Sequence, residues 1–270
     1  MRLLLAALAL FALLVWAKLA RAEVICTLLA DPVTGAILLE EGDCATPVTP
    51  ASTFKIPLAA MGYDAGFLTD AHHPVLSFQP GDPDWGGENW LRDTDPTSWM
   101  LYSVVWYSQR ITRALGADRL TTYALAFGYG NADFSGDPGQ DNGLERAWIA
   151  SSLLVSPRDQ ARFLQALVTD SLPVSQAAMT QTRALVEGRR IEDWQMQGKT
   201  GGAYPRRADR SFDYARGWGW YVGWAERAGR QIVFVRLIQG REPSQTSPGL
   251  LARDAFLADW PALARRIATP

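Results

Sequence analysis

The fold and the chemistry of this chain are decided by the stretch TPASTFKIPLAAM, residues 49–61, in which a serine and a lysine interrupt an apolar run. A buried ammonium is costly unless a partner, or loss of its proton, removes the charge. Residues three apart on a helix are neighbours, so Ser52 and Lys55 share one face. Pro50 suits the first helical position, which puts Ser52 in the first turn, where free N–H groups favour a developing oxyanion. The spacing indicates a serine nucleophile with a lysine base.

Lysine is rare in this chain, and its positions are therefore informative. The only lysines are Lys18, Lys55 and Lys199; the other basic residues are arginines. A genome biased towards arginine codons explains the excess of arginine. Arginine keeps its proton in proteins, whereas a buried lysine can release it. Lys199 lies in the segment GKTGG and Ser103 in the segment YSVV. The Ser-x-x-Lys tetrad alone is weak evidence, but the three segments together are specific.

The N-terminus predicts a secretory signal peptide over residues 1–22. It begins MRLLL, continues as an apolar run to residue 17, and ends in Ala20-Arg21-Ala22, a small-x-small cleavage pattern. A membrane anchor is the alternative, but Lys18 interrupts the run before the roughly 20 residues that span a bilayer. We expect a periplasmic protein with no stable membrane association. Losing three positive charges takes the formal charge from −2 to −5, and nothing indicates nucleic-acid binding.

The two cysteines, Cys26 and Cys44, lie in a predicted β-hairpin. Two apolar segments flank the turn signal DPVTG, residues 31–35. A hairpin brings the cysteines near each other, and an exported protein meets an oxidising compartment. We predict a disulfide; two free structural thiols are the alternative.

Histidine usage argues against metal chemistry. The only two histidines, His72 and His73, are adjacent in the loop-like segment LTDAHHPVL. Neighbouring side chains do not face the same way, and the cysteines are better used as a bridge, so we expect no metal site. The segment also offers no motif that supports a Ser-His-Asp triad, and a solvated loop is the simpler interpretation.

Predicted strands lie at both ends of the chain, and predicted helices lie between them. Strand patterns cover the hairpin 24–40 and the segments 194–202, 217–226 and 230–239. Helix patterns cover 96–116, 117–128, 157–168 with Ser156 as N-cap, and 249–267. This order predicts an α/β (α+β) fold in which both termini build one sheet flanked by helices. We expect residues 23–270 to form a single domain, with an all-helical lobe at about 61–190 and a site in the cleft between the lobes.

At these motifs the sequence resembles the penicillin-recognising serine enzymes, which carry S-x-x-K, then S-x-N or S-x-V, then K-T-G. The variant is similar to the class D β-lactamases, the oxacillinase family. The matching segments are Ser52-Thr53-Phe54-Lys55, Ser103-Val104-Val105, Tyr129-Gly130-Asn131 and Lys199-Thr200-Gly201. The resemblance covers essentially the whole mature chain and implies a serine β-lactamase/transpeptidase-like fold with an antiparallel sheet. The segment Tyr129-Gly130-Asn131 lies near a turn, and a purely structural role remains open.

The resemblance also implies roles for individual residues. Ser52 is expected to be the nucleophile, and Lys55 is expected to be carboxylated by CO2 and to act as general base, with no other cofactor. The residues that match the pocket around this lysine are Phe54, Val105, Trp148 and Ile149. Ser103 and Lys199 are expected to pass a proton to the leaving nitrogen.

Substrate binding is implied for the K-T-G segment and one arginine. Backbone N–H groups of Ser52 and Gly202 are expected to form the oxyanion hole. Thr200 and Gly201, together with Arg253, are expected to hold the substrate and its carboxylate, and Arg241 is the rival of Arg253. Many family members have an aromatic residue where Gly202 stands. Within the basic loop 204–217, Tyr204 either replaces that aromatic wall or belongs to a mobile, solvated loop.

The function implied is hydrolysis of the β-lactam ring of penicillins and related antibiotics through an acyl-enzyme, which gives antibiotic resistance. The expected partner is a small β-lactam, and the protein is expected to be a monomer or a homodimer. Two alternatives share the acylated serine: a β-lactam-sensing module and a cell-wall D,D-peptidase. A sensor requires transmembrane helices, and the peptidases typically keep Ser-x-Asn where this chain has Ser103-Val104-Val105.

Overall fold

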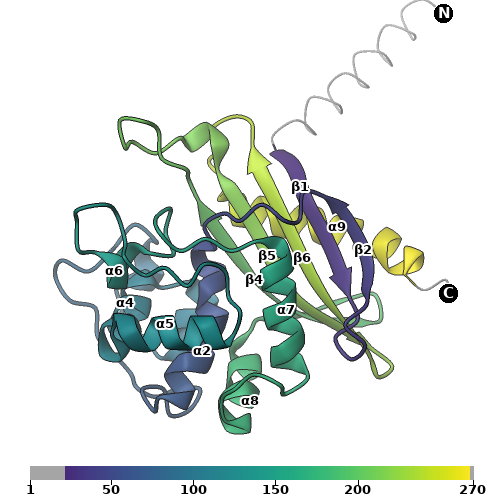
Figure 1. The fold of residues 1–270 in the computed structure, drawn as a ribbon, viewed down its shortest axis with the longest axis horizontal. Coiled ribbons are helices and arrows are strands. Elements are labelled where there is room, and N and C mark those ends of the chain that lie inside the picture. Colours follow the sequence, from purple (N-terminus) through teal and green to yellow (C-terminus); the bar gives the residue numbers. More distant parts are fainter. Residues whose placement is uncertain (1–21, 268–270) are drawn as a thin grey trace, which may run out of the picture.

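The computed structural model describes residues 22–267, and Figure 1 shows a sheet with helices on both of its faces. The predicted signal peptide lies outside the described residues except for Ala22, which begins the first strand. Both ends of the described chain lie beside the sheet, while the middle of the chain forms the helical part. The predicted α+β architecture is confirmed.

Within the described residues, six strands form one antiparallel sheet in the order β2-β1-β6-β5-β4-β3. Their bounds are β1 (Ala22–Ala30), β2 (Ile37–Gly42), β3 (Gly188–Ile191), β4 (Trp194–Ala203), β5 (Trp218–Arg227) and β6 (Arg230–Gly240). The pairing of β1 with β6 joins the two ends of the chain, as the sequence pattern predicted. The predicted neighbours β5 and β6 are paired across the turn at residues 227–230.

The helices divide between the two faces of the sheet (Figure 1). The α-helices are α2 (Lys55–Asp64), α3 (Pro96–Tyr102), α4 (Val105–Leu115), α5 (Ala117–Ala126), α6 (Gly143–Arg146), α7 (Pro157–Val168), α8 (Gln176–Leu185) and α9 (Pro248–Arg266). Short 3₁₀ helices are η1 (Ala51–Phe54), η2 (Glu88–Trp90) and η3 (Tyr214–Arg216). Helix α9 covers one face through an aromatic core that includes Phe256 and Trp260. The remaining α-helices and the opposite face enclose a second, larger core.

Two local predictions are confirmed. Cys26 and Cys44 form a disulfide, so the alternative of two free thiols is excluded. Ser156 caps α7 in a reciprocal capping box with Asp159: the Asp159 N–H donates to the Ser156 hydroxyl, and the Ser156 N–H donates to the Asp159 carboxylate. This arrangement satisfies N–H groups that the first helical turn leaves free.

The predicted single helix over residues 96–116 is wrong. The helix is interrupted between α3 and α4 because Ser103 adopts a left-handed conformation, with φ at 57°. An ordinary L-residue pays an energetic cost in this region, so surrounding contacts must hold it there. Ser103 therefore lies at a corner between two helices and not on a helix face.

The start of the helix after Pro50 also differs from the prediction. Pro50 is the N-cap, residues Ala51–Phe54 form the 3₁₀ turn η1, and α2 begins only at Lys55. Side chains three apart eclipse one another in a 3₁₀ helix. The tighter turn therefore keeps Ser52 and Lys55 on one face.

Candidate active site

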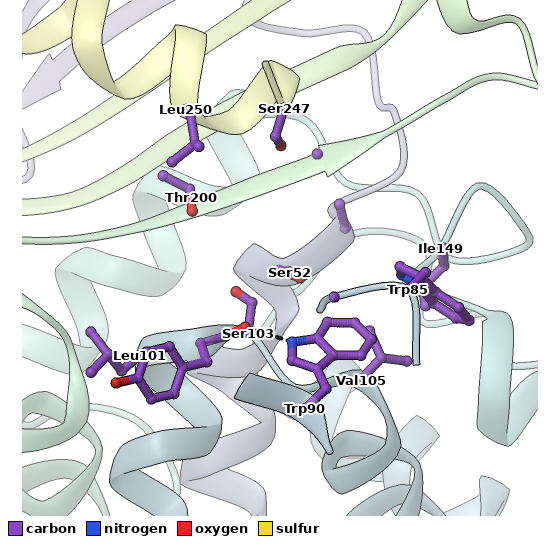
Figure 2. A pocket seen from close by; sticks show the side chains of 14 residues that line it. Ser52, Trp85, Trp90, Leu101, Ser103, Val105, Ile149, Thr200, Ser247 and Leu250 are labelled. Carbon is purple, nitrogen blue, oxygen red and sulfur yellow. Dashed lines mark hydrogen bonds between the residues drawn. The ribbon is translucent and has the colours of Figure 1, made fainter. Parts of the chain in front are cut away.

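Ser52 lines a cavity of about 450 Å³ between the helical part and strand β4. Figure 2 shows Ser52 and Ser103 between a wall formed by Thr200, Ser247 and Leu250 and a second group of side chains that includes Trp90. The lining residues are Ala51, Ser52, Trp85, Gly86, Trp90, Leu101, Tyr102, Ser103, Val105, Ile149, Thr200, Gly202, Ser247 and Leu250. The cavity thus combines hydroxyl groups with a largely apolar and aromatic surround, as is typical of a small-molecule site.

Strand β4 approaches the Ser52 turn closely because Gly201 has no side chain. A Cβ at Gly201 would lie 2.8 Å from the Pro50 carbonyl oxygen and 3.1 Å from the Thr53 nitrogen. A Cβ at Gly202 would lie 2.9 Å from the Ser247 hydroxyl oxygen. The two glycines therefore let the strand lie against both η1 and the start of α9.

Lys55 is buried directly beneath Ser52. Its side chain is 1% exposed, and its Nζ donates to the Ser52 Oγ at 3.5 Å. Burial, helped by the positive charge of Lys199, holds the pKa of Lys55 well below its ordinary value. Since desolvation favours the uncharged form of a lysine, this amine can act as a base or a nucleophile.

Ser103 and Lys199 form the second polar pair of the site. The left-handed corner at Ser103 brings its hydroxyl onto the Lys199 ammonium, which donates to it and also to the Thr200 carbonyl at 3.1 Å. Burial lowers the pKa of Lys199 to about 8, against the opposing effect of Glu187. This lysine therefore changes charge close to neutral pH.

Of the four residues expected around Lys55, two lie in the core and two line the cavity. Phe54 and Trp148 are fully buried and stack with their ring centroids 5.4 Å apart. Val105 and Ile149 line the cavity. Trp148 is only 1% exposed. A buried indole N–H usually finds a hydrogen-bond partner.

Tyr129 belongs to a buried hydrogen-bonded chain behind the nucleophile. The Tyr129 hydroxyl donates to Gln160 on α7, the Gln160 amide donates to the Thr53 hydroxyl at 2.7 Å, and Thr53 donates to the Pro50 carbonyl. The Tyr129 ring also packs on Phe54. The Tyr129 segment is thus connected to the turn that carries Ser52, and no atom of Tyr129 lines the cavity.

Comparison with known proteins agrees with this geometry. Residues 25–259 match the penicillin binding protein transpeptidase domain. The chain is 42% identical to beta-lactamase OXA-9 of Klebsiella pneumoniae, over 88% of this chain and 87% of that protein. The chain belongs to the class D β-lactamases. It is 34% identical to beta-lactamase OXA-1 of Escherichia coli, over 84% of this chain and 80% of that protein.

A solved class D structure has the same fold. The crystal structure of the OXA-427 class D β-lactamase superposes with a TM-score of 0.83 and 45% identity, covering 90% of this chain and 99% of that one. The protein is accordingly a serine β-lactamase, a hydrolase, and the expected S-x-x-K, S-x-V and K-T-G segments of the class meet at one cavity.

Neither arginine expected to bind a carboxylate lines the cavity of this class D enzyme. Arg253 pairs with its neighbour Asp254, and Arg241 pairs with Glu23 on β1. Ser247 takes the position next to Thr200 and Gly202 instead. Serine is too common in loops for the sequence to single out Ser247.

The aromatic side chains that line the cavity are not the one suggested by the sequence, Tyr204. Tyr204 packs against Tyr214, with ring centroids 4.9 Å apart, and does not line the cavity. Trp85 and Trp90 provide the aromatic surface, with centroids 5.5 Å apart. Within the basic loop Arg206 stacks on Phe212, and it forms an ion pair with Asp137 outside the loop. The chain's many tryptophans gave no indication of which two would face the site.

The two histidines of the chain lie outside the cavity. His72 pairs with Asp95, and His73 pairs with Asp70, both at the surface and away from the cavity. No cluster of three or more His, Cys, Asp or Glu side chains within residues 22–267 is arranged to hold a metal ion.

The described helices include none with the length and apolar character needed to cross a membrane.

Proposed function

We propose that this enzyme hydrolyses the β-lactam ring of penicillins and related antibiotics through an acyl-enzyme on Ser52, giving its host antibiotic resistance. The observation that carries the proposal is the Ser52–Lys55 pair: a serine that lines the cavity, 3.5 Å from a buried lysine with a lowered pKa. A serine hydroxyl is a weak nucleophile until a neighbouring base takes its proton.

Lys55 is proposed to carry a carboxyl group derived from CO2. Only a neutral amine can add CO2, and burial, by lowering the pKa of Lys55, favours the neutral amine. The indole N–H of Trp148 would donate to the added group, and Phe54, Val105 and Ile149 would exclude water from it. The carboxyl group would give Lys55 a basic oxygen in place of its amine. The pocket therefore fits the modification in both charge and hydrogen bonding.

Acylation uses both polar pairs of the site, Ser52 with Lys55 and Ser103 with Lys199. Ser52 Oγ attacks the lactam carbonyl carbon while carboxylated Lys55 accepts the serine proton. The C–N bond of the ring then breaks, and the nitrogen receives a proton from the Ser103 hydroxyl, which the Lys199 ammonium replenishes. Ser52 and Gly202 both line the cavity, and their backbone N–H groups would stabilise the oxyanion.

Deacylation reuses Lys55. Between the two half-reactions Lys55 passes the serine proton to solvent, and Lys199 regains one from solvent. Lys55 then accepts a proton from a water molecule, which attacks the ester carbonyl, and returns that proton to the Ser52 oxygen as the ester bond breaks. The same residue thus serves both half-reactions, so loss of Lys55 should stop the second one most severely.

The substrate carboxylate is proposed to bind the hydroxyls of Thr200 and Ser247 beside the Lys199 ammonium. Both hydroxyls line the cavity, and hydrogen bonds of ionised groups are the stronger ones. Arg253 lies one helical turn beyond Leu250 on α9 and remains a prediction as a further, longer-range partner. Arg241, paired with Glu23, is the weaker candidate.

We further propose that residues 23–270 are the mature, single-domain protein in the periplasm, as a monomer or homodimer. The apolar leader and the disulfide between Cys26 and Cys44 support export to an oxidising compartment. A small β-lactam is the only partner this function requires.

Turnover of a β-lactam by the purified mature protein tests the proposal. We expect catalytic hydrolysis of oxacillin or a chromogenic cephalosporin. In samples quenched soon after mixing, intact mass spectra should show one acyl group per protein, and digestion should place that group on the peptide that contains Ser52. The Ser52→Gly variant should show neither. Stoichiometric acylation without turnover would instead indicate a β-lactam sensor.

The pKa of Lys199 predicts an alkaline limit to activity. As the pH rises through about 8, Lys199 loses the charge that attracts the substrate carboxylate, so kcat/KM should fall. In a Lys199→Arg variant, whose charge does not titrate, that fall should be absent even if the overall rate is lower. The measurement is the pH profile of kcat/KM at constant bicarbonate. An alkaline limb that is identical in the arginine variant would show that another group causes it.

A further inference from the structure

Thr49, in the segment before the nucleophile, bridges two backbone groups of the loop that carries Trp148. Its hydroxyl donates to the Trp148 carbonyl at 2.9 Å and accepts from the Ala150 N–H at 2.9 Å. The Ala51 N–H donates to the same Trp148 carbonyl at 3.0 Å. One side chain thereby spans the peptide units on both sides of Ile149, which itself lines the cavity.

The rest of Thr49 is fixed to the sheet. Its carbonyl accepts from the indole N–H of Trp220 at 2.9 Å, and Trp220 is a fully buried residue of the central strand β5, paired with Gly201. Thr49 itself is 5% exposed. The bridge therefore connects a rigid part of the fold to the loop.

The bridged loop needs such support. Ala150 has a φ of 52°, a left-handed conformation that alanine holds only when its surroundings impose it. The Ala150 N–H donates its hydrogen bond to the Thr49 hydroxyl. Without that hydroxyl, the half-buried N–H would lose its partner, and the backbone from Trp148 to Ala150 could relax.

We propose that Thr49 is a positioning residue for the carboxylation of Lys55: it holds the Trp148 loop so that the indole stays beside the lysine. This inference rests on the proposed carbamate mechanism. Thr49 does not line the substrate cavity, and its hydroxyl bonds Trp148 and Ala150, so its effect on CO2 affinity is indirect.

A bicarbonate titration of Thr49→Val tests the inference, because valine keeps the shape and removes the hydroxyl. Two readouts are needed: the steady-state rate, and the intensity of the 13C carbamate signal in protein equilibrated with 13C-bicarbonate. Both midpoints should move to about tenfold more bicarbonate, the change expected for loss of one or two hydrogen bonds. Thr49→Ser, which keeps the hydroxyl, should restore the parent midpoint. If the Thr49→Val variant does not fold, Thr49→Ala is measured in its place.

Thr112→Val is the matched control. Thr112 is also fully buried and its hydroxyl also bonds backbone carbonyls, those of Gln109 and Leu144, but it does not line the cavity. This variant should keep the parent midpoint even if its melting temperature falls. Equal shifts in the Thr112 and Thr49 variants, or an unshifted Thr49→Val, would overturn the role of Thr49 alone. A parent protein with no 13C signal at any bicarbonate concentration would overturn the carbamate mechanism itself, and this inference with it.

Discussion

Replacing Lys55 with alanine should leave an enzyme that is acylated slowly and then stays acylated. The variant loses the base that activates water for deacylation, and general-base catalysis contributes roughly 10²- to 10⁴-fold. Turnover should fall by at least that factor, while intact mass spectrometry after mixing with oxacillin should show one acyl group per protein that persists for many parent turnovers. The burst amplitude in stopped-flow absorbance should equal the enzyme concentration.

The Lys55→Met variant separates chemistry from packing. Methionine refills most of the volume that alanine leaves empty, and the site tolerates an apolar side chain because its neighbours Phe54 and Trp148 are apolar. Both variants should therefore fold and should trap the acyl-enzyme alike. Parent-like turnover in either one would exclude Lys55 as the base.

Replacing Ser103 with alanine should instead slow the formation of the acyl-enzyme. The Ser103 hydroxyl, held by the Lys199 ammonium, is the nearest proton donor to the leaving nitrogen in the proposed mechanism. Without it the acylation rate should fall by roughly 10²- to 10³-fold, within the range for positioned acids and bases. Single-turnover kinetics should show slow acylation and no accumulated adduct, the reverse of the Lys55 result.

Ser103→Gly is the control for the backbone at this corner. Alanine must hold the left-handed φ of 57° without the hydroxyl's bond to Lys199, whereas glycine adopts that conformation freely. If both variants lose acylation equally, the hydroxyl is the cause. Recovery of acylation in the glycine variant would mean that Ser103 shapes the turn and does not move a proton.

Much of the site was predictable because the chemistry of the motifs is carried by short, local spacings. Ser52 and Lys55 are three residues apart, and either kind of helical turn puts them on one face. Rare lysines drew attention to Lys199. The hairpin and the strands β4, β5 and β6 were predictable because they are apolar segments bounded by turn signals, and the hairpin placed Cys26 beside Cys44. The edge strand β3, with the sequence GRRI, was not predicted because it is short and has no apolar run.

The remaining features depend on contacts between distant segments. The break at Ser103 is imposed by tertiary contacts, among them the Trp90 indole N–H, which donates to the Tyr102 carbonyl at 2.9 Å. No local helix breaker signals it, and the apolar periodicity runs through. Ser247 reaches the cavity only because β4 has a glycine, Gly202, beside it. The role of the Thr49 hydroxyl could not be predicted, because its partner Trp148 lies far along the chain.

The most direct test of the central claim is the 13C NMR spectrum of the mature protein equilibrated with 13C-bicarbonate. A carbamate resonance that is present in the parent, absent from Lys55→Ala, and lost on acidification together with activity is the predicted result. The sign follows from the lowered pKa of Lys55: acid protonates the amine, which then cannot hold CO2. A fully active parent with no such resonance would contradict the account.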